Sequence, residues 1–261
     1  FAGSSFLTRI IRTRPNLLIE LAEDGPDVFC EKILTLIFDQ DLSCDRDGLM
    51  RDLRLYRQSI SLATAMADIA GLWSLEEVTG TLTDFADASV RISLDWLLKN
   101  KSAQYGLDIP PTGDQCQCVV LGMGKYGARE LNYSSDIDIV VFYEPDGIVS
   151  LDSHKLAEFW IDLTRDLSTI LQFTTDAGFV FRVDLRLRPD PGSTPVAVSI
   201  PAAETYYESF GQNWERAAFI KARQIAGDKR TGDKLLAILS PFIWRKNLDF
   251  AAIEDVHAMK R

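Results

Sequence analysis

The stretch that decides the fold is Val120-Leu121-Gly122-Met123-Gly124-Lys125-Tyr126-Gly127-Ala128-Arg129-Glu130-Leu131-Asn132-Tyr133-Ser134-Ser135-Asp136-Ile137-Asp138-Ile139-Val140-Val141. An apolar run ends at Gly122, a short segment follows, and a second apolar run opens with two aspartates. Glycine lets backbone N–H groups approach a phosphate closely, because no Cβ stands in the way. We therefore expect two strands joined by a turn and a short helix, with Gly122, Gly124 and Lys125 binding phosphate. An ordinary tight turn is the alternative, since the spacing matches neither the P-loop nor the dinucleotide fingerprint.

Two acidic side chains, Asp136 and Asp138, follow this turn. Residues i and i+2 of a strand point to one face, so these carboxylates lie side by side while Ile137 and Ile139 point to the other face. Neighbouring carboxylates repel each other unless a cation lies between them, and Mg²⁺ prefers such oxygen ligands. The pair therefore predicts a metal site, although solvated acids on an exposed strand edge would give the same pattern.

A third carboxylate lies in Phe181-Arg182-Val183-Asp184-Leu185-Arg186-Leu187-Arg188. The alternation of apolar and polar residues predicts a strand over residues 179–187, with Asp184 and the three arginines on one face. Asp184 would complete the metal site, and Arg186 and Arg188 would hold phosphate oxygens bidentately. Two Mg²⁺ ions bridged by three carboxylates can activate a nucleophile and stabilise a leaving oxygen at phosphorus. A half-exposed strand without chemistry shows the same alternation.

The rest of the chain predicts helices around these strands. Residues 1–105 are helical in pattern, and Ser74 and Glu77 form a capping-box pair before the last long helix. Further strands or strand candidates are expected at 118–121, 137–143, 179–187 and 196–199. Residues 206–226 are expected to be helical with an interruption near Gly211. We therefore expect an α+β fold, in which a mixed sheet is edged by helices and preceded by a helical block.

The composition narrows the class of protein. The chain has 261 residues, 46% hydrophobic, and a formal net charge of −10, which disfavours a nucleic acid or an anionic membrane as partner. The sequence has no membrane-length apolar run, and its only two histidines exclude a multi-histidine metal site. Four cysteines without zinc-site spacing indicate a reducing compartment, so we expect a cytoplasmic location. The chain opens with Phe1 and ends in a helical pattern, so we expect it to be part of a longer polypeptide.

At these residues the sequence resembles a known superfamily. Gly122-x-Gly124, Asp136-x-Asp138 and the later Asp184 form the pattern of nucleotidyltransferases, which include DNA polymerase β. The longer string Gly-Met-Gly-Lys-x-Gly-x-x-Glu-Leu-Asn-x-x-Ser-Asp-Ile-Asp is similar to glutamine synthetase adenylyltransferases, as are residues 184–189 and 214–223. The resemblance implies a polymerase β-like catalytic core at 106–228, after a helical block at 1–105 and before the start of another helical segment at 229–261.

The resemblance also implies roles for single residues. The residues expected to be catalytic and to bind metal are Asp136, Asp138 and Asp184. Those expected to bind nucleotide or phosphate are Gly122, Gly124, Lys125, Ser135, Arg186 and Arg188. Trp214, Glu215 and Arg216 either line the nucleotide pocket or form a core contact with a salt bridge. The loop at 190–192 departs from the usual pattern of the family.

That family carries two related nucleotidyltransferase domains on one long chain. The N-terminal domain removes AMP from a tyrosine of glutamine synthetase by phosphorolysis and releases ADP, and the C-terminal domain attaches AMP from ATP. Residues 181–189, 206–207 and 213–216 look more like the N-terminal domain. The resemblance implies Mg²⁺ as cofactor and, as partners, glutamine synthetase, a nitrogen-signalling regulatory protein, ADP or ATP, and phosphate. The alternatives are adenylylation or another nucleotidyltransferase of this fold, and a non-catalytic interaction module.

Overall fold

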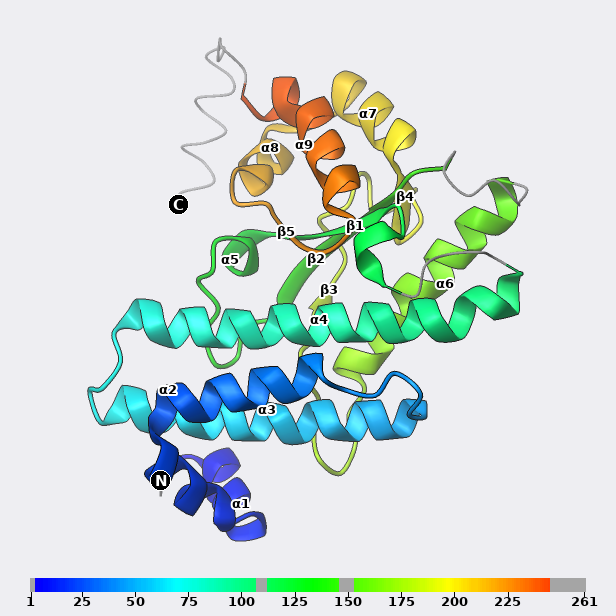
Figure 1. The fold of residues 1–261 in the computed structure, drawn as a ribbon. Coiled ribbons are helices and arrows are strands. Elements are labelled where there is room, and N and C mark those ends of the chain that lie inside the picture. Colours follow the sequence, from blue (N-terminus) through cyan, green and yellow to red (C-terminus); the bar gives the residue numbers. More distant parts are fainter. Residues whose placement is uncertain (1–2, 107–111, 146–152, 245–261) are drawn as a thin grey trace.

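The computed structural model describes residues 3–106, 112–145 and 153–244, and its first part is helical (Figure 1). The helices of this part are α1 (Ser5–Thr13), α2 (Asn16–Phe38), α3 (Arg46–Ile69) and α4 (Leu75–Tyr105). The predicted capping box is confirmed at the start of α4, where the Glu77 N–H donates to Ser74 Oγ (3.2 Å) and the Ser74 N–H donates to Glu77 Oε2 (2.6 Å). Within the described ranges, no helix has the length and apolar character needed to cross a membrane.

A mixed sheet forms the second part. Within the described residues its strands are β1 (Cys118–Gly122), β2 (Ile137–Tyr143), β3 (Val183–Asp184), β4 (Ala197–Ser199) and β5 (Arg223–Gly227). The order is β3-β2-β1-β5, with β1 antiparallel to β2 and β5. β3 pairs in parallel with the start of β2 and β4 with its end. The other helices are α5 (Gly124–Gly127), α6 (Ser153–Gln172), α7 (Ile200–Ser209), α8 (Asn213–Ile220) and α9 (Lys229–Ile243), besides a 3₁₀ turn at Gly113–Gln115.

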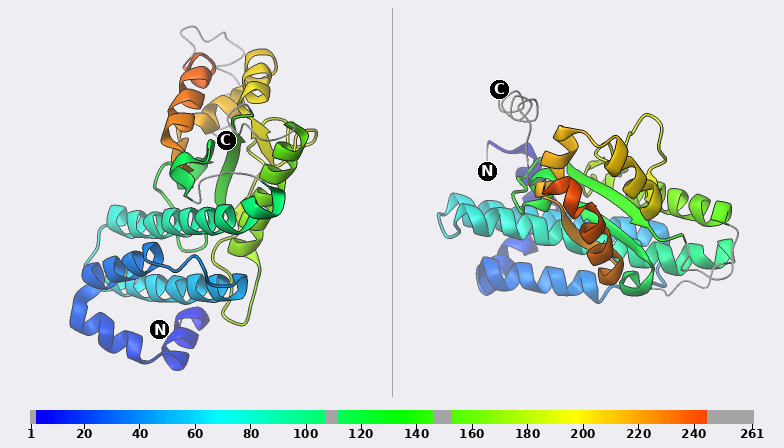
Figure 2. Two further views of the ribbon diagram at one scale, coloured as in Figure 1. Left: turned by 45° about the vertical axis from the view of Figure 1, so that its right-hand side comes forward. Right: turned by 90° about the horizontal axis from the view of Figure 1, so that it is seen from above.

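Helices cover both faces of the sheet (Figures 1 and 2). Ile137, Ile139 and Val141 of β2 pack into the core shared with α3, α4 and α6. Val140 and Phe142 pack into a second core with α7, α8 and α9. The alternation predicted for this strand is confirmed, and it directs Asp138 to the α7–α9 side of the sheet.

The helical block and the sheet are joined by packing. Buried side chains of α1 to α4 and of β1, β2, β5 and α6 belong to one hydrophobic cluster. Two arginines reinforce the junction at α4: Arg223 forms a bidentate ion pair with Asp87 (2.6 and 3.1 Å), and Arg91 Nε donates to the Ile225 carbonyl (2.7 Å). The expected α+β fold is confirmed, while the division into segments near residue 105 stays a prediction.

The strand expected over residues 179–187 is wrong except at Val183–Asp184. Residues 179–181 do not form hydrogen bonds typical of a strand. The N–H groups of Val180 and Phe181 both donate to the Leu171 carbonyl at the end of α6 (2.8 and 3.1 Å). Arg54 and Arg57 of α3 donate hydrogen bonds to the carbonyls of Gly178 and Phe179. The alternation of the sequence therefore reflects side-chain burial here without a long paired strand.

The expected helix over residues 206–226 is correct in part. The predicted interruption lies between the end of α7 at Ser209 and the start of α8 at Asn213. The last residues instead form β5, which pairs with β1 through an irregularity between Val120 and Leu121. This strand completes the sheet on the side away from β3.

Candidate active site

The glycine turn brings the backbone against Asp138. Gly124 has a φ of 55°, and a Cβ at this position would stand 3.0 Å from Asp138 Oδ2. The Met123 N–H donates to the Asp138 carbonyl (2.9 Å). At Gly122 a Cβ would stand 3.0 Å from the Ile225 side chain. Both glycines therefore allow the turn to pack closely on β2 and β5, and their binding of phosphate stays a prediction.

A third glycine, Gly127, fixes the far end of the turn. A Cβ there would stand 2.0 Å from the Lys221 carbonyl oxygen and 2.4 Å from that of Gly122, so any other residue requires the backbone to move. Its spacing from Gly122 and Gly124 does not match the dinucleotide fingerprint, and the sequence alone predicted no role for it. Lys125 lies on the same short helix with an exposed side chain, and its binding of phosphate stays a prediction.

The three aspartates come together where β2 and β3 run side by side. Asp138 and Asp184 are direct partners in this parallel pair, and Asp136 precedes Asp138 by two residues. Their charges act on one another: burial raises the pKa of Asp138, and the neighbouring Asp184 and Asp136 raise it further. The clustering that the sequence predicted is present in the structure.

Arginines hold the two outer carboxylates of this cluster. Arg182 Nε donates to Asp136 Oδ1 (2.5 Å), and Arg186 donates to Asp184 Oδ2 through Nη2 (2.5 Å) and Nε (2.9 Å). The hydrogen bonds from the Arg186 side chain hold the pKa of Asp184 below its usual range. The sequence placed Arg182 on a polar face without a role, because its partner could not be read from the alternation.

The donor set of the cluster suits a hard divalent cation. Three carboxylates meet, and a cation would lower the raised pKa of Asp138. In this conformation, however, no three acidic, cysteine or histidine side chains of the described chain are arranged to hold a metal ion. The physical reason is that Asp136 and Asp184 point their oxygens at guanidinium groups. A metal ion would therefore compete with Arg182 and Arg186 for the same oxygens.

The expectation that Arg186 and Arg188 share a strand face with Asp184 is wrong. Asp184 Oδ1 accepts the backbone N–H of Arg186 (2.8 Å), and this turn ends the strand. Arg188 then donates to the carbonyls of Leu185 and Pro191 (both 2.8 Å) and of Thr194 (3.3 Å). These bonds close the loop around residues 190–192. The predicted binding of phosphate by Arg188 stays a prediction.

Ser135 shapes the loop that leads into β2. Its Oγ accepts the Asn132 N–H (3.2 Å), and its own N–H donates to the Asn132 carbonyl (3.2 Å). Asn132 Oδ1 also accepts the Ser134 N–H (3.1 Å). The hydroxyl therefore helps to set the position of Asp136, and its contact with phosphate stays a prediction.

The segment Trp214-Glu215-Arg216 divides between surface and core. Trp214 is 42% exposed, whereas Glu215 and Arg216 are buried. Glu215 Oε2 accepts the Gln212 N–H (2.8 Å) and the Tyr206 hydroxyl (3.1 Å), and burial raises the pKa of Glu215. Arg216 Nε donates to the carbonyl of Phe242 in α9 (2.9 Å). These contacts support the core interpretation for Glu215 and Arg216.

The sequence of this chain is similar to that of a known protein family. Residues 1–238 match the model of a protein family described as glutamate-ammonia ligase adenylyltransferase. The bifunctional glutamine synthetase adenylyltransferase/adenylyl-removing enzyme of Bradyrhizobium diazoefficiens is 46% identical over 99% of this chain and 26% of its own length. The enzymes of that name from Xanthobacter autotrophicus and Mesorhizobium japonicum are each 45% identical, over 99% and 100% of this chain and over 26% and 27% of their own lengths.

The chain thus spans about a quarter of the length of these relatives. Its mixed sheet with flanking helices is consistent with the nucleotidyltransferase-like fold that the resemblance implied. The family match covers α1 to α8, the whole sheet and most of α9, and therefore includes all three aspartates and the glycine turn. On this evidence, the chain belongs to the glutamate-ammonia ligase adenylyltransferase family.

Proposed function

We propose that this chain removes AMP from an adenylylated tyrosine of glutamine synthetase by Mg²⁺-dependent phosphorolysis. The observation that carries the proposal is the pairing of Asp138 with Asp184 between β2 and β3, with Asp136 directly before β2 and the turn at Gly124 beside Asp138. The substrate protein, glutamine synthetase, is taken from the names of the bifunctional enzymes that this chain resembles. The choice of removal over attachment rests on the likeness of residues 181–189 and 213–216 to the N-terminal domain of the family.

The proposed reaction moves one AMP group between two oxygens. An orthophosphate oxygen attacks the α-phosphorus, the bond from phosphorus to the tyrosine oxygen breaks, and the products are ADP and a tyrosine hydroxyl that takes up a proton. Protein groups chiefly position the reactants and stabilise the charge on the phosphoryl oxygens in such a transfer. The carboxylates serve either direction equally, so they do not select removal over attachment.

Each part of the site has a proposed task. Asp136, Asp138 and Asp184 would hold divalent cations, which supply charge neutralisation at phosphorus when bound. The glycine turn and Lys125 bind phosphate oxygens. A guanidinium that leaves Asp184 when a cation takes its place can turn to a phosphate, so Arg186 serves both partners. A nitrogen-signalling regulatory protein is a further proposed partner, on the family resemblance alone.

Calorimetric titration with ADP tests the metal and nucleotide site. We expect saturable binding of ADP in the presence of Mg²⁺, weakened at least about tenfold by EDTA or by Asp138→Asn. Asp233→Asn is the matched control, because Asp233 is an exposed acid on α9 that pairs only with Lys229 among the described residues. ADP and ATP affinities that are the same with Mg²⁺ and with EDTA, or no nucleotide binding at all, would favour a non-catalytic interaction module.

A further inference from the structure

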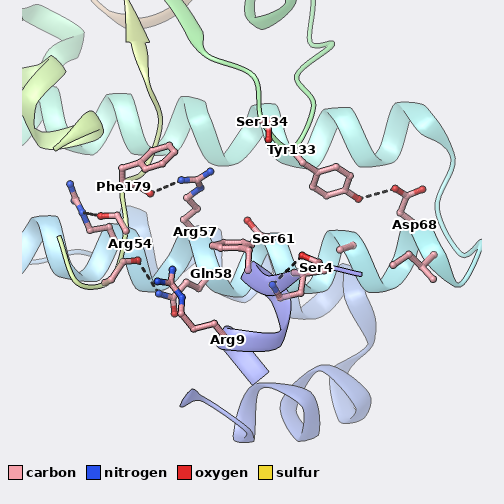
Figure 3. Close-up of a pocket in the computed structure, with 16 residues that line it drawn as sticks. Ser4, Arg9, Arg54, Arg57, Gln58, Ser61, Asp68, Tyr133, Ser134 and Phe179 are labelled. Carbon is pink, nitrogen blue, oxygen red and sulfur yellow. Dashed lines mark hydrogen bonds between the residues drawn. The ribbon is translucent and has the colours of Figure 1, made fainter. Parts of the chain in front are cut away.

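A pocket of about 510 Å³ lies between the helical block and the loop that leads to Asp136 (Figure 3). α1 and α3 supply one side of it, and residues 133–134 and 177–179 supply the other. Its volume falls within the range of about 300–1,000 Å³ that is typical of small-molecule sites. None of the residues assigned above to phosphate or metal lines it, so it is a separate feature of the molecule.

The pocket carries positive charge that its own lining does not neutralise. Its charged residues are Arg9, Arg54, Arg57 and Asp68. Arg54 is fully buried and donates to backbone carbonyls of α3, α6 and the loop after α6. Asp68 Oδ2 accepts the Tyr133 hydroxyl (2.9 Å). Within the described part of the chain, neither Arg9 nor Arg57 forms an ion pair with a carboxylate, so both are available to an anion.

Arg57 is the central cation of the pocket. Its Nη1 donates to the Phe179 carbonyl (2.6 Å), and its guanidinium lies 4.4 Å from the centre of the Phe179 ring. The rings of Phe181 and Phe6 lie at 5.8 and 5.9 Å. Burial, together with the neighbouring charges of Arg182 and Arg54, lowers the pKa of Arg57 to about 10, so the group is a poorly hydrated cation at pH 7. An anion placed beside it would replace the missing water.

The remaining lining residues are largely apolar. Phe6, Leu7, Ala65, Ile69 and Phe179 all line the cavity. A free inorganic ion would leave these surfaces in contact with water. A neutral apolar molecule would leave the guanidinium groups of Arg9 and Arg57 without an anionic partner. The lining therefore suits a molecule with both an anionic group and an apolar body.

We propose that this pocket binds a small organic anion, which carries one carboxylate or phosphate group on an apolar body about the size of an aromatic ring. Arg57 and Arg9 bind the anionic group, and Phe6, Leu7 and Ile69 contact the body. The site adjoins the carboxylate cluster, because Ser134 lines the pocket and its carbonyl accepts from Arg182, which also holds Asp136. The proposal concerns binding alone and does not depend on the proposed function.

Calorimetric titration of the chain with four probes tests the chemistry of the ligand. We expect 4-phenylbutyrate or phenyl phosphate to bind at one site, at least about tenfold more tightly than the neutral 4-phenylbutanamide and than inorganic phosphate. The preference between the two aryl anions decides between a carboxylate and a phosphate ligand. Equal binding of the amide, tighter binding of inorganic phosphate, or no saturable binding of either aryl anion would overturn the proposal.

Three variants place the bound probe in the pocket. Ser61→Phe fills the pocket from α3, where Ser61 is half-buried, and Arg57→Gln and Arg9→Gln each remove one cation. We expect each to weaken the binding of the tighter aryl anion at least about tenfold. Arg51→Gln on α3 and Arg12→Gln on α1 lie outside the pocket lining and should bind it like the wild type.

Circular dichroism and thermal melting establish that each variant is folded before its affinity is measured. If Arg57→Gln fails to fold, Ser61→Phe and Arg9→Gln carry the test. Wild-type affinity in both of these folded variants would show that the aryl anion binds elsewhere, and it would overturn the assignment of the pocket.

Discussion

Asp138 and Asp184 are direct partners on two parallel strands, yet their pKa values move in opposite directions. Hydrogen bonds from Arg186 lower the pKa of Asp184, whereas burial and the two neighbouring acids raise that of Asp138. The repulsion among the three carboxylates therefore chiefly destabilises the charged form of Asp138. A divalent cation or a proton would relieve it.

Asp138→Asn should abolish turnover without loss of stability. A carboxyl whose pKa is raised on folding destabilises the folded state once both states are ionised, and this penalty disappears as pH falls below the unfolded-state pKa. The variant should therefore match or slightly exceed the wild type in free energy of unfolding at pH 7, with no such advantage in acid. Urea denaturation at both pH values measures this.

The same variant should keep less than about a tenth of the wild-type rate on adenylylated glutamine synthetase, a loss of more than about 1.4 kcal/mol of transition-state stabilisation. Asp233→Asn on α9 should change neither the free energy of unfolding nor this rate. A rate above a tenth of wild type would remove Asp138 from the metal site.

Arg186→Gln should raise the pKa of Asp184 toward its ordinary value, because the side-chain hydrogen bonds that lower it are lost. Carbon-13 NMR titration of the carboxyl group measures this shift. The stability that Asp184 contributes through Arg186 is present above the unfolded pKa and is lost as pH falls through the lowered folded pKa, so the variant should lose stability at neutral pH but not in strong acid. An unchanged Asp184 titration in Arg186→Gln would contradict the pairing.

Arg186→Lys should also lower activity, because an ammonium group cannot present two parallel donors to a carboxylate or a phosphate. Arg188→Lys should lower it for a different reason, through loosening of the loop that Arg188 holds by backbone carbonyls. Steady-state kinetics on both variants and the Asp184 titration separate the two effects. The titration should change only in Arg186→Lys.

Gly127→Ala should destabilise the protein by roughly 1–3 kcal/mol, because its Cβ would overlap the Lys221 and Gly122 carbonyls and force the turn to move. Gly80→Ala is the matched control. A Cβ at Gly80, inside α4, meets only Arg129 at 3.8 Å, so alanine should stabilise that helix by about 0.5–1 kcal/mol. Urea denaturation of both variants gives the comparison, and equal effects would contradict the packing of the turn.

Arg223→Met should cost about 1–3 kcal/mol, because it leaves the Asp87 carboxylate at the junction of α4 and β5 without its bidentate partner. Asp87→Asn in the same chain should recover part of this loss, since the carboxylate left unpaired by Arg223→Met is then replaced by a neutral amide. A double-mutant cycle by thermal or urea denaturation measures the coupling free energy. A coupling near zero would show that this ion pair does not join the two parts.

The sequence predicted β2 at its observed boundaries, because its apolar run is buried on both faces and begins at the two aspartates. It did not predict β5. Residues 223–227 mix polar and apolar side chains without a clear period, and their pairing depends on β1, which lies far away in the chain. At residues 179–187 the alternation predicted a strand that is mostly absent. The apolar side chains alternate as in a strand, but the backbone groups of residues 179–181 form hydrogen bonds with α3 and α6.

Within the candidate site, the nearness of the three aspartates could be predicted, whereas their charge partners could not. The nearness of Asp136 to Asp138 follows from their spacing of two residues at the start of β2, and the nearness of Asp138 to Asp184 follows from strand pairing. The contact between Arg186 and Asp184 depends on the turn that follows β3. That turn is stabilised by the hydrogen bond from the Arg186 N–H to the Asp184 side chain, which the sequence pattern does not reveal. Arg57 gave no signal in the sequence, because one arginine in an amphipathic helix is ordinary.

Product analysis tests the central claim most directly. The chain is mixed with adenylylated glutamine synthetase, Mg²⁺ and orthophosphate, and in a parallel reaction with unmodified glutamine synthetase, Mg²⁺ and ATP. We expect ADP and unmodified tyrosine from the first reaction and no AMP-labelled protein from the second. Labelling of glutamine synthetase from ATP, with no ADP formed in the phosphate reaction, would contradict this expectation and assign the chain to adenylylation.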